Sequence, residues 1–147
     1  MFLGRYQHTL DEKGRLTIPA RFREFLGDQG AYLTRGFDQN LIVFPQDIFL
    51  RISQRVNRIS MTDPSARLLR RLIFSNAELV EVDKIGRILI PQFLREAGNL
   101  DGEAVIVGMS DHFEIWSPHL WSTQSTLMQD SEPTALRFID LDLSTGE

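Results

Sequence analysis

Alternating apolar and polar positions recur along this chain in short runs that predict β-strands. Leu16 and Ile18 flank Thr17, and this run lies between a glycine-containing turn at 11–14 and Pro19. A short alternating run with turn residues at both ends is typical of a strand. Further runs predict strands at AYLTRG (31–36), LIVF (41–44), Val80 with Val82, ILI (88–90), EAVIVGM (103–109) and FEIW (113–116).

Other segments have the apolar spacing of helices. Two short segments begin at a proline and end at a glycine: PARFREFLG (19–27) and PQFLREAG (91–98). Three longer segments have amphipathic spacing: 46–59, 64–74 and 118–129. Asp63 is a suitable cap for the helix that Pro64 opens. The side chains expected to face inward are Ile48, Ile52, Val56 and Ile59 in one helix, and Leu68, Leu69, Leu72 and Ile73 in the next.

The pattern of elements occurs twice. DEKGRLTIPARFRE (11–24) and DKIGRILIPQFLRE (83–96) are identical at seven of fourteen positions and lie 72 residues apart. Aromatic residues further along keep the same offset: Phe44 with Trp116, and Phe49 with Trp121. The repeat indicates a duplicated unit. One such unit is too small to bury its own apolar strands well, so we expect two units to pack together.

Charge is distributed unevenly along the chain. The net charge is −4, but residues 130–147 contain five acids and one Arg, so residues 1–129 sum to zero. Residues 50–75 contain six Arg and one Asp, and residues 1–27 contain five basic and three acidic residues. Because binding depends on the local field, the acidic total does not exclude a nucleic-acid partner. A solvated Arg-rich helix face is the alternative interpretation.

Composition narrows the chemistry that we expect. The chain has no cysteine, so disulfides, thiolate metal sites and cysteine nucleophiles are excluded. His8, His112 and His119 lack the spacing of a metal site, and Ser110 lacks the glycine that would complete a nucleophile elbow. No apolar run approaches the roughly 20 residues of a membrane span, and the N-terminus lacks a signal-peptide pattern. We therefore expect no metal, no cofactor, no membrane association and no enzymatic activity, in a cytoplasmic protein.

The repeated Asp-x-x-x-Arg is the most distinctive motif. Asp11 and Arg15, like Asp83 and Arg87, flank a glycine-containing turn, so each pair can meet across the base of its turn. One interpretation is a salt bridge that only fixes the hairpin and contributes about 0–1 kcal/mol. The other is a phosphate contact, because further basic residues surround both turns.

Two such motifs at this separation, in a chain of this length, resemble the MraZ family. These proteins are bacterial transcriptional regulators built from two AbrB-type (SpoVT-AbrB) units. DEKGR (11–15) and DKIGR (83–87) stand where the family has its signatures, and the resemblance extends from MFLGRY through the acidic tail.

The resemblance implies an α+β fold that is mostly β. Its pseudo-twofold tandem AbrB-like units would form an interleaved β-barrel with flanking helices. The expected divisions are a first AbrB-type unit at 1–50, linking helices at 51–76, a second unit at 77–122, and a C-terminal helix end with a loosely ordered acidic tail at 123–147.

The resemblance also implies a function. Members bind short direct repeats of double-stranded DNA in the promoter of the division and cell-wall gene cluster, usually repressing it. They assemble into homo-oligomeric rings of about eight or more subunits. We expect the same of this chain, with a nucleoid-associated location.

The resemblance, the crowding of basic residues near the first turn and the turn pattern itself together assign roles to two sets of residues. The expected DNA-binding residues are Lys13, Arg15, Arg21, Lys84 and Arg87, and the expected loop-stabilising residues are Asp11, Gly14, Asp83 and Gly86. One departure affects the comparison of the two loops, because the third loop position is Lys13 in the first and Ile85 in the second.

Two other functions remain open. AbrB-type folds also serve as antitoxins or protein-interaction modules, and co-purification of a small toxin would favour that class. A hydrolase centred on Ser110 is the third possibility, which activity screening would test.

Overall fold

The computed structural model describes residues 1–130 and 136–145, and its strands pair antiparallel throughout. The elements are β1 (Arg5–Thr9), β2 (Arg15–Thr17), α1 (Ala20–Leu26), the 3-10 helix η1 (Gly27–Gln29), β3 (Ala31–Arg35), β4 (Leu41–Pro45), α2 (Gln46–Asn57), α3 (Pro64–Ser75), β5 (Glu78–Val80), β6 (Arg87–Leu89), α4 (Gln92–Ala97), β7 (Glu103–Gly108), β8 (Phe113–Trp116) and α5 (Pro118–Gln129). The α+β class is confirmed, and each predicted strand and helix is present within a few residues of its expected position.

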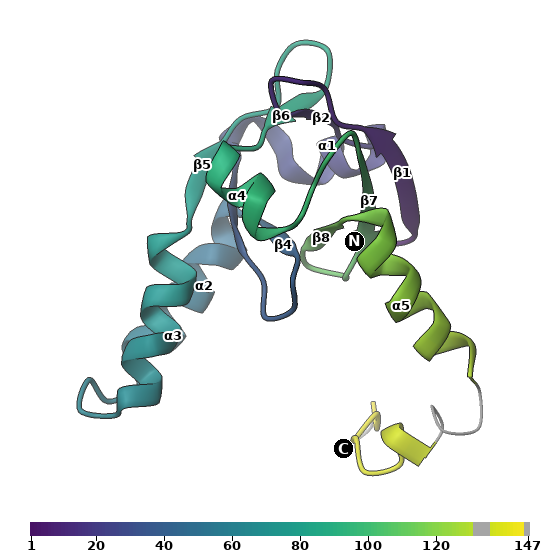
Figure 1. Cartoon of the computed structure of the whole chain (residues 1–147). Coiled ribbons are helices and arrows are strands. Elements are labelled where there is room, and N and C mark those ends of the chain that lie inside the picture. Colours follow the sequence, from purple (N-terminus) through teal and green to yellow (C-terminus); the bar gives the residue numbers. More distant parts are fainter. Residues whose placement is uncertain (131–135, 146–147) are drawn as a thin grey trace.

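The strands of both units are mixed within one sheet. Six strands lie in the order β1-β7-β8-β4-β3-β5, and β2 pairs with β6 to form a separate two-stranded ribbon. Figure 1 shows the ribbon at the top of the molecule, with α2 and α3 extending as one leg and α5 as another. Within the described residues, the pairings leave β1 and β5 as sheet edges, so the expected closed barrel is not confirmed.

The strand registers have the symmetry of a twofold axis. Leu16 pairs with Ile88 between β2 and β6, and Ile42 pairs with Glu114 between β4 and β8. Both pairs join residues 72 positions apart, so each unit meets its own counterpart at these two points. The duplicated sequence therefore folds as two exchanged halves that share one core.

The offset of 72 residues does not hold for β3 and β7. Ala31 pairs with Val80, whereas Ala104, not Glu103, makes the equivalent pair with His8. The two strands are therefore related by 73 residues. The turn between β3 and β4 has five residues (36–40) and that between β7 and β8 has four (109–112), which restores the offset of 72 at β8. This one-residue shift keeps apolar side chains on the inner face of both strands, since a slip of one would reverse them.

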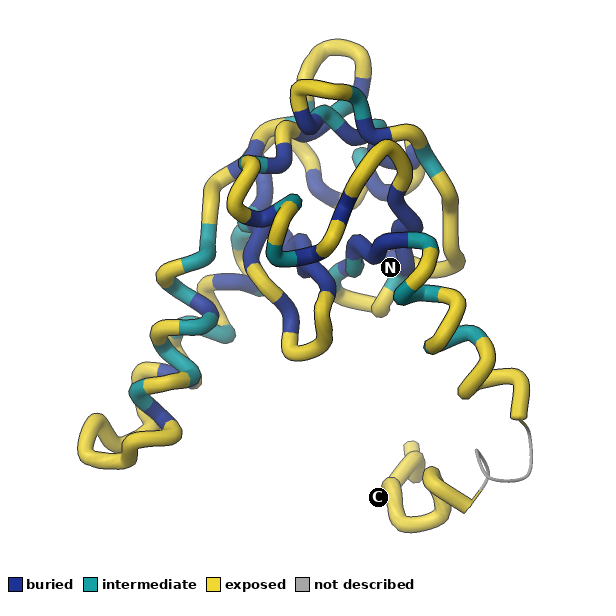
Figure 2. Tube along the Cα trace, in the orientation of Figure 1, coloured by how far each residue is buried: buried dark blue, intermediate teal, exposed yellow. Residues whose placement is uncertain are grey.

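The shared core lies between the six-stranded sheet and the ribbon. Its centre is aromatic: the ring centroids of Phe2 and Phe113 both lie 5.2 Å from that of Phe22. Leu16 and Ile88 from the ribbon are also fully buried in this cluster. Figure 2 shows the buried residues concentrated there and the turns and helix ends exposed.

Two smaller clusters cover the outer face of the sheet. In the first unit, Tyr32 stacks on Phe49 of α2 with centroids 4.5 Å apart, and α3 adds Ile73. In the second, Trp116 meets Trp121 of α5 at 5.8 Å. The Phe44–Phe49 pair (6.0 Å) is the counterpart of this tryptophan pair, as the shared offset predicts.

Two predicted core positions are wrong. Leu68 is 67% exposed and Ile59 is 40% exposed. The inner face of α3 is formed by Ala66 and Ile73 with Leu69, at spacings of three and seven, and Leu68 lies off this stripe. Ile59 lies beyond the end of α2 at Asn57, so its side chain does not continue the inward-facing stripe of that helix.

The end of the chain extends away from the core. Residues 136–145 are exposed, while 131–135 and 146–147, which belong to the segment expected to be loosely ordered, lie outside the described residues. In the described part of the chain, no helix has the length and apolar character needed to cross a membrane.

Candidate nucleic-acid interface

The first Asp-x-x-x-Arg segment forms a tight turn organised by one carboxylate. Oδ1 of Asp11 accepts hydrogen bonds from the backbone N–H groups of Lys13 (3.0 Å) and Arg15 (2.8 Å). The N–H of Gly14 donates to the carbonyl of Asp11 at 3.0 Å, and Gly14 has a φ of +89°. An Asp that accepts from backbone groups two and four residues ahead closes the turn locally.

The second segment repeats this geometry. Oδ1 of Asp83 accepts from the N–H groups of Ile85 (3.1 Å) and Arg87 (2.8 Å). The N–H of Gly86 donates to the carbonyl of Asp83 at 3.0 Å, again with a φ of +89°. The two turns therefore have the same backbone although two of their five residues differ.

The ribbon brings the two turns to one end of the molecule. Between the turns, the N–H of Ile18 donates to the carbonyl of Gly86 (2.9 Å) and that of Ile90 donates to the carbonyl of Gly14 (2.8 Å). The glycine of each turn thus accepts a hydrogen bond from the residue that directly follows the ribbon strand of the other unit. Figure 1 shows both loops projecting together above β2 and β6.

An arginine from each short helix lies against the opposite turn. A methyl group at Gly14 would lie 2.6 Å from the carbonyl oxygen of Ile90 and 2.7 Å from Nε of Arg95. A methyl group at Gly86 would lie 2.8 Å from Cζ of Arg23. Nε is buried without a hydrogen-bond partner in both arginines. The candidate site residues inferred from the sequence omitted this pair, although both arginines are identical between the copies.

The two motif arginines differ in their ion pairs. Nε of Arg87 donates to Oδ2 of Asp83 at 2.9 Å, and its Nη1 lies 3.8 Å from Oδ2 of Asp11. Nε of Arg15 is 4.0 Å from Oδ2 of Asp11. Arg15 is therefore held less tightly by carboxylates and its guanidinium is the more available of the two.

The turn geometry also acts on the acids. The backbone N–H of Arg15 is the main cause that lowers the pKa of Asp11, and the N–H of Arg87 does the same for Asp83. The adjacent guanidinium groups lower both pKa values further. Hydrogen bonds to the charged form stabilise it, so both carboxylates stay ionised near neutral pH.

The outer face of the ribbon presents a mixed surface. Successive strand residues point to opposite faces, so Arg15 and Thr17 point outward while Leu16 is buried, and Arg87 and Leu89 point outward from β6. Arg15 pairs with Leu89, and Thr17 with Arg87. The site predicted from the sequence did not include Thr17 and Leu89. Their alternation with the buried Leu16 and Ile88 is the one sequence signal that could have indicated them.

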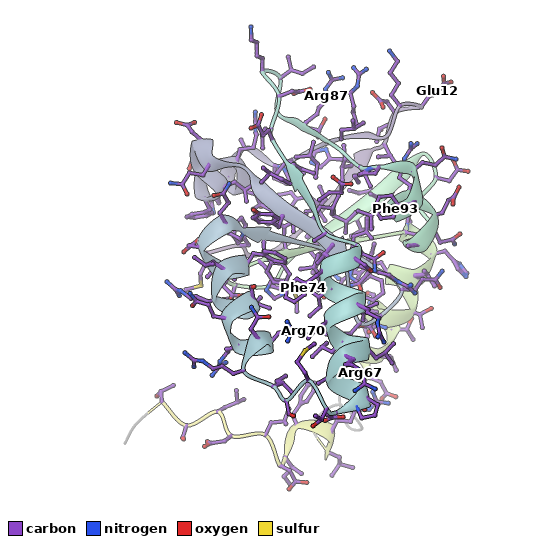
Figure 3. All side chains as sticks on the ribbon, turned by 90° about the vertical axis from the view of Figure 1, so that its left-hand side faces the viewer. Glu12, Arg67, Arg70, Phe74, Arg87 and Phe93 are labelled. Carbon is purple, nitrogen blue, oxygen red and sulfur yellow. The ribbon has the colours of Figure 1, made fainter. Side chains whose placement is uncertain are left out.

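The remaining predicted basic residues are less symmetric. Lys13 and Lys84 are exposed at the loop tips but occupy different loop positions, and Ile85, at the position of Lys13, is 66% exposed. Arg21 is exposed on α1, where the second unit has Phe93. Figure 3 shows Arg87 and Glu12 at the loop end and Phe93 lower, on α4.

The alternative chemistry at Ser110 gains no geometric support. Nδ1 of His112 is 2.7 Å from Oδ1 of Asp111, and the backbone N–H of Ser110 donates to the carbonyl of Phe2 at 2.9 Å. Among the described residues, no hydrogen bond joins the Ser110 hydroxyl to His112, and no group of three or more His, Asp or Glu side chains could hold a metal ion.

Comparison with known proteins places the chain in one family. The model of the family described as "MraZ protein, putative antitoxin-like" matches twice, at residues 1–72 and 73–138. The chain is 46% identical over 134 residues to "Transcriptional regulator MraZ" of Thermomicrobium roseum, which covers 91% of this chain and 94% of that relative. It is 47% identical over 133 residues to the protein of the same name from Herpetosiphon aurantiacus (90% and 92%), and 44% identical over 142 residues to that of Desulforamulus reducens (96% and 99%). With two family units spanning the duplicated fold and relatives aligned along nearly their whole length, the chain belongs to the MraZ family.

Proposed function

We propose that this protein is a sequence-specific DNA-binding transcriptional regulator that contacts promoter DNA through its paired Asp-x-x-x-Arg loops. The observation that carries this proposal is the placement of two turns with the same backbone geometry, each with its arginine, at one projecting end of the molecule. The names of the relatives, which are transcriptional regulators, support the same class of function.

The shape of this end suits the major groove. A two-stranded β-ribbon fits into a groove about 12 Å wide, and β2 with β6 is such a ribbon. Its outward residues include two arginines, which pair with guanine edges or phosphates, and an exposed leucine, Leu89, which can meet a thymine methyl. Lys13 and Lys84 at the loop tips are suited to phosphates, which position a protein without reading sequence.

The two loops would not contribute equally. Arg15 has one distant carboxylate partner, whereas Arg87 is held by Asp83 and also lies near Asp11. We propose that Arg15 reads a base or phosphate directly and that Arg87 mainly fixes the ribbon and the orientation of the neighbouring loop. Asp11, Asp83, Gly14 and Gly86 would maintain the two turns.

The finer assignments come from the family resemblance. We propose that the protein represses the division and cell-wall gene cluster from its own promoter. It would assemble into a homo-oligomeric ring and so bind short direct repeats. Head-to-tail subunits present identical faces in the same sense, whereas a twofold dimer would require inverted sites.

The test replaces the more available arginine. Arg15→Ala should abolish binding to the upstream DNA of the protein's own gene in a fluorescence-anisotropy titration. Its Tm should fall by only about 2–4 °C, because a partly exposed pair at this distance contributes less than about 1 kcal/mol. Arg35→Ala, at the exposed end of β3 and outside the predicted DNA-binding set, is the matched control and should leave the affinity unchanged. For Arg15→Ala, unchanged affinity, or a collapse of Tm together with affinity, would refute a direct contact by Arg15.

A further inference from the structure

The helical hairpin of α2 and α3 carries a second concentration of positive charge, remote from the loops. Residues 50–75 contain six Arg and one Asp. Of these arginines only Arg51 has an acidic partner in the described part of the chain, Asp47 at 3.9 Å. Figure 3 places Arg67 and Arg70 toward the end of α3 that is opposite the Arg87 end of the molecule. The ribbon interface therefore does not account for this charge.

Apolar groups accompany these arginines. A groove of ≈ 290 Å³ is lined by Met61, Arg67, Arg70, Arg71, Phe74 and Ser75. Met61 is 57% exposed, and Leu68 on the adjoining surface is 67% exposed. Nη1 of Arg67 donates to the carbonyl of Met61 at 3.0 Å, which holds the loop at the mouth of the groove. A peptide that carries both carboxylates and apolar side chains would match this combination of arginines with Met61 and Phe74.

The acidic tail has the complementary chemistry. Ile139, Leu141 and Leu143 alternate with Asp140 and Asp142, and the three apolar side chains are 73%, 61% and 83% exposed. Among the described residues, none of these three apolar side chains belongs to a buried cluster. The segment offers carboxylates for the arginines of the groove and apolar groups for its methionine and phenylalanine.

We propose that the tail of one copy, residues 136–145, docks in the α3 groove of a second copy. The tail follows α5, and Figure 1 shows α5 and the α2–α3 hairpin diverging as separate legs. Within the described residues, no ion pair or hydrogen bond joins the tail to the hairpin of the same chain. Because the donor and the receiving groove are different surfaces, a copy that gives its tail to one neighbour can receive the tail of another.

Single cysteines provide a direct test, because the chain has no native cysteine. Ser75→Cys at the groove and Ser144→Cys in the tail are placed in separately tagged full-length chains, which are mixed and mildly oxidised. We expect a disulfide-linked pair that contains both tags. Glu12→Cys, at the exposed loop end, replaces Ser75→Cys as the control and should give at least about tenfold less product.

Charge reversal then tests the recognition itself. Asp140→Lys with Asp142→Lys in the tail should lower the Ser75–Ser144 cross-link yield about tenfold, since like charges at an interface suppress pairing. Arg70→Glu with Arg71→Glu in the receiving chain should restore the yield. Melting curves show whether the Arg70→Glu, Arg71→Glu variant folds. If it does not, the loss of cross-linking in the Asp140→Lys, Asp142→Lys variant still tests the proposal.

Three results would overturn the proposal. The first is a yield with Glu12→Cys equal to that with Ser75→Cys. The second is a cross-link that forms only within a chain carrying both Ser75→Cys and Ser144→Cys, independent of concentration, which would make the occupant the chain's own tail. The third is unchanged cross-linking but reduced DNA affinity in the Arg70→Glu, Arg71→Glu variant, which would make the groove a nucleic-acid surface. Loss of DNA binding by Arg15→Ala leaves the inference untouched, because the loops lie at the other end.

Discussion

Gly14→Ala tests whether the two turns are locked to one another. Gly14 has a φ of +89°, which an L side chain adopts at a cost of about 1–2 kcal/mol. The added methyl would also lie 2.6 Å from the carbonyl oxygen of Ile90 and 2.7 Å from Nε of Arg95. Forcing atoms into such a packed site costs a further 1–3 kcal/mol or so. We therefore expect a destabilisation of about 2–5 kcal/mol, which lowers the Tm by roughly 4–20 °C in a chain of this size.

Two other glycines separate the contributions. Gly102 has a φ of +76° but no atom within 4 Å of an added methyl, so Gly102→Ala should lower the Tm by only about 2–8 °C through backbone strain. At Gly86 the obstructing group is the side chain of Arg23, which can move more easily than the Ile90 backbone. The expected order of destabilisation is Gly14→Ala, then Gly86→Ala, then Gly102→Ala.

Thermal unfolding followed by circular dichroism, with denaturant titration as a second measure, gives these differences. If Gly14→Ala melts within about 2 °C of Gly102→Ala, the turns can separate without loss and the close approach across the ribbon does not stabilise the fold. DNA affinity of the same variants reports the loop geometry. Gly14→Ala should weaken binding more than Gly102→Ala, since only Gly14 lies in a loop of the ribbon.

Three further predictions concern binding and pH. If a concentrated basic face contacts DNA, log affinity should fall with log salt at a slope of at least about −4 when several subunits engage, and flat binding between about 50 and 200 mM would exclude that face. The folded-state pKa of Asp83 is lowered from 3.8, so its ionised form adds stability that is present above that value and lost as pH falls through the folded pKa. Asp83→Asn should therefore melt below the wild type from pH 5 to 8 or so, with a difference that narrows below about pH 4, and a difference independent of pH would refute this origin. Inserting about five base pairs between direct repeats should weaken binding by turning one site to the opposite side of the duplex, and light scattering should give a mass well above a dimer. A dimer that prefers a palindrome would contradict the ring.

The sequence alone determined the elements, because their signals are local. Alternation around Leu16, the proline and glycine that bound each short helix, and the Asp63 cap all act within a few residues of chain. The Asp63 side chain accepts from the N–H of Ser65 at 2.9 Å, as the cap predicts. The duplication was equally visible, since identical residues at a fixed offset need no structure to be found.

Only the tertiary structure decided which strands pair and what lies over each turn. β1 pairs with β7, about a hundred residues away, because neither unit alone can bury both faces of its strands. That exchange places Arg95 over Gly14 and Arg23 over Gly86, contacts that connect residues far apart in the chain. It also fixes the 73-residue relation of β3 to β7, since burial of alternate side chains selects the register. The sequence records which residues repeat, but the distances between them follow from packing the two copies around one core.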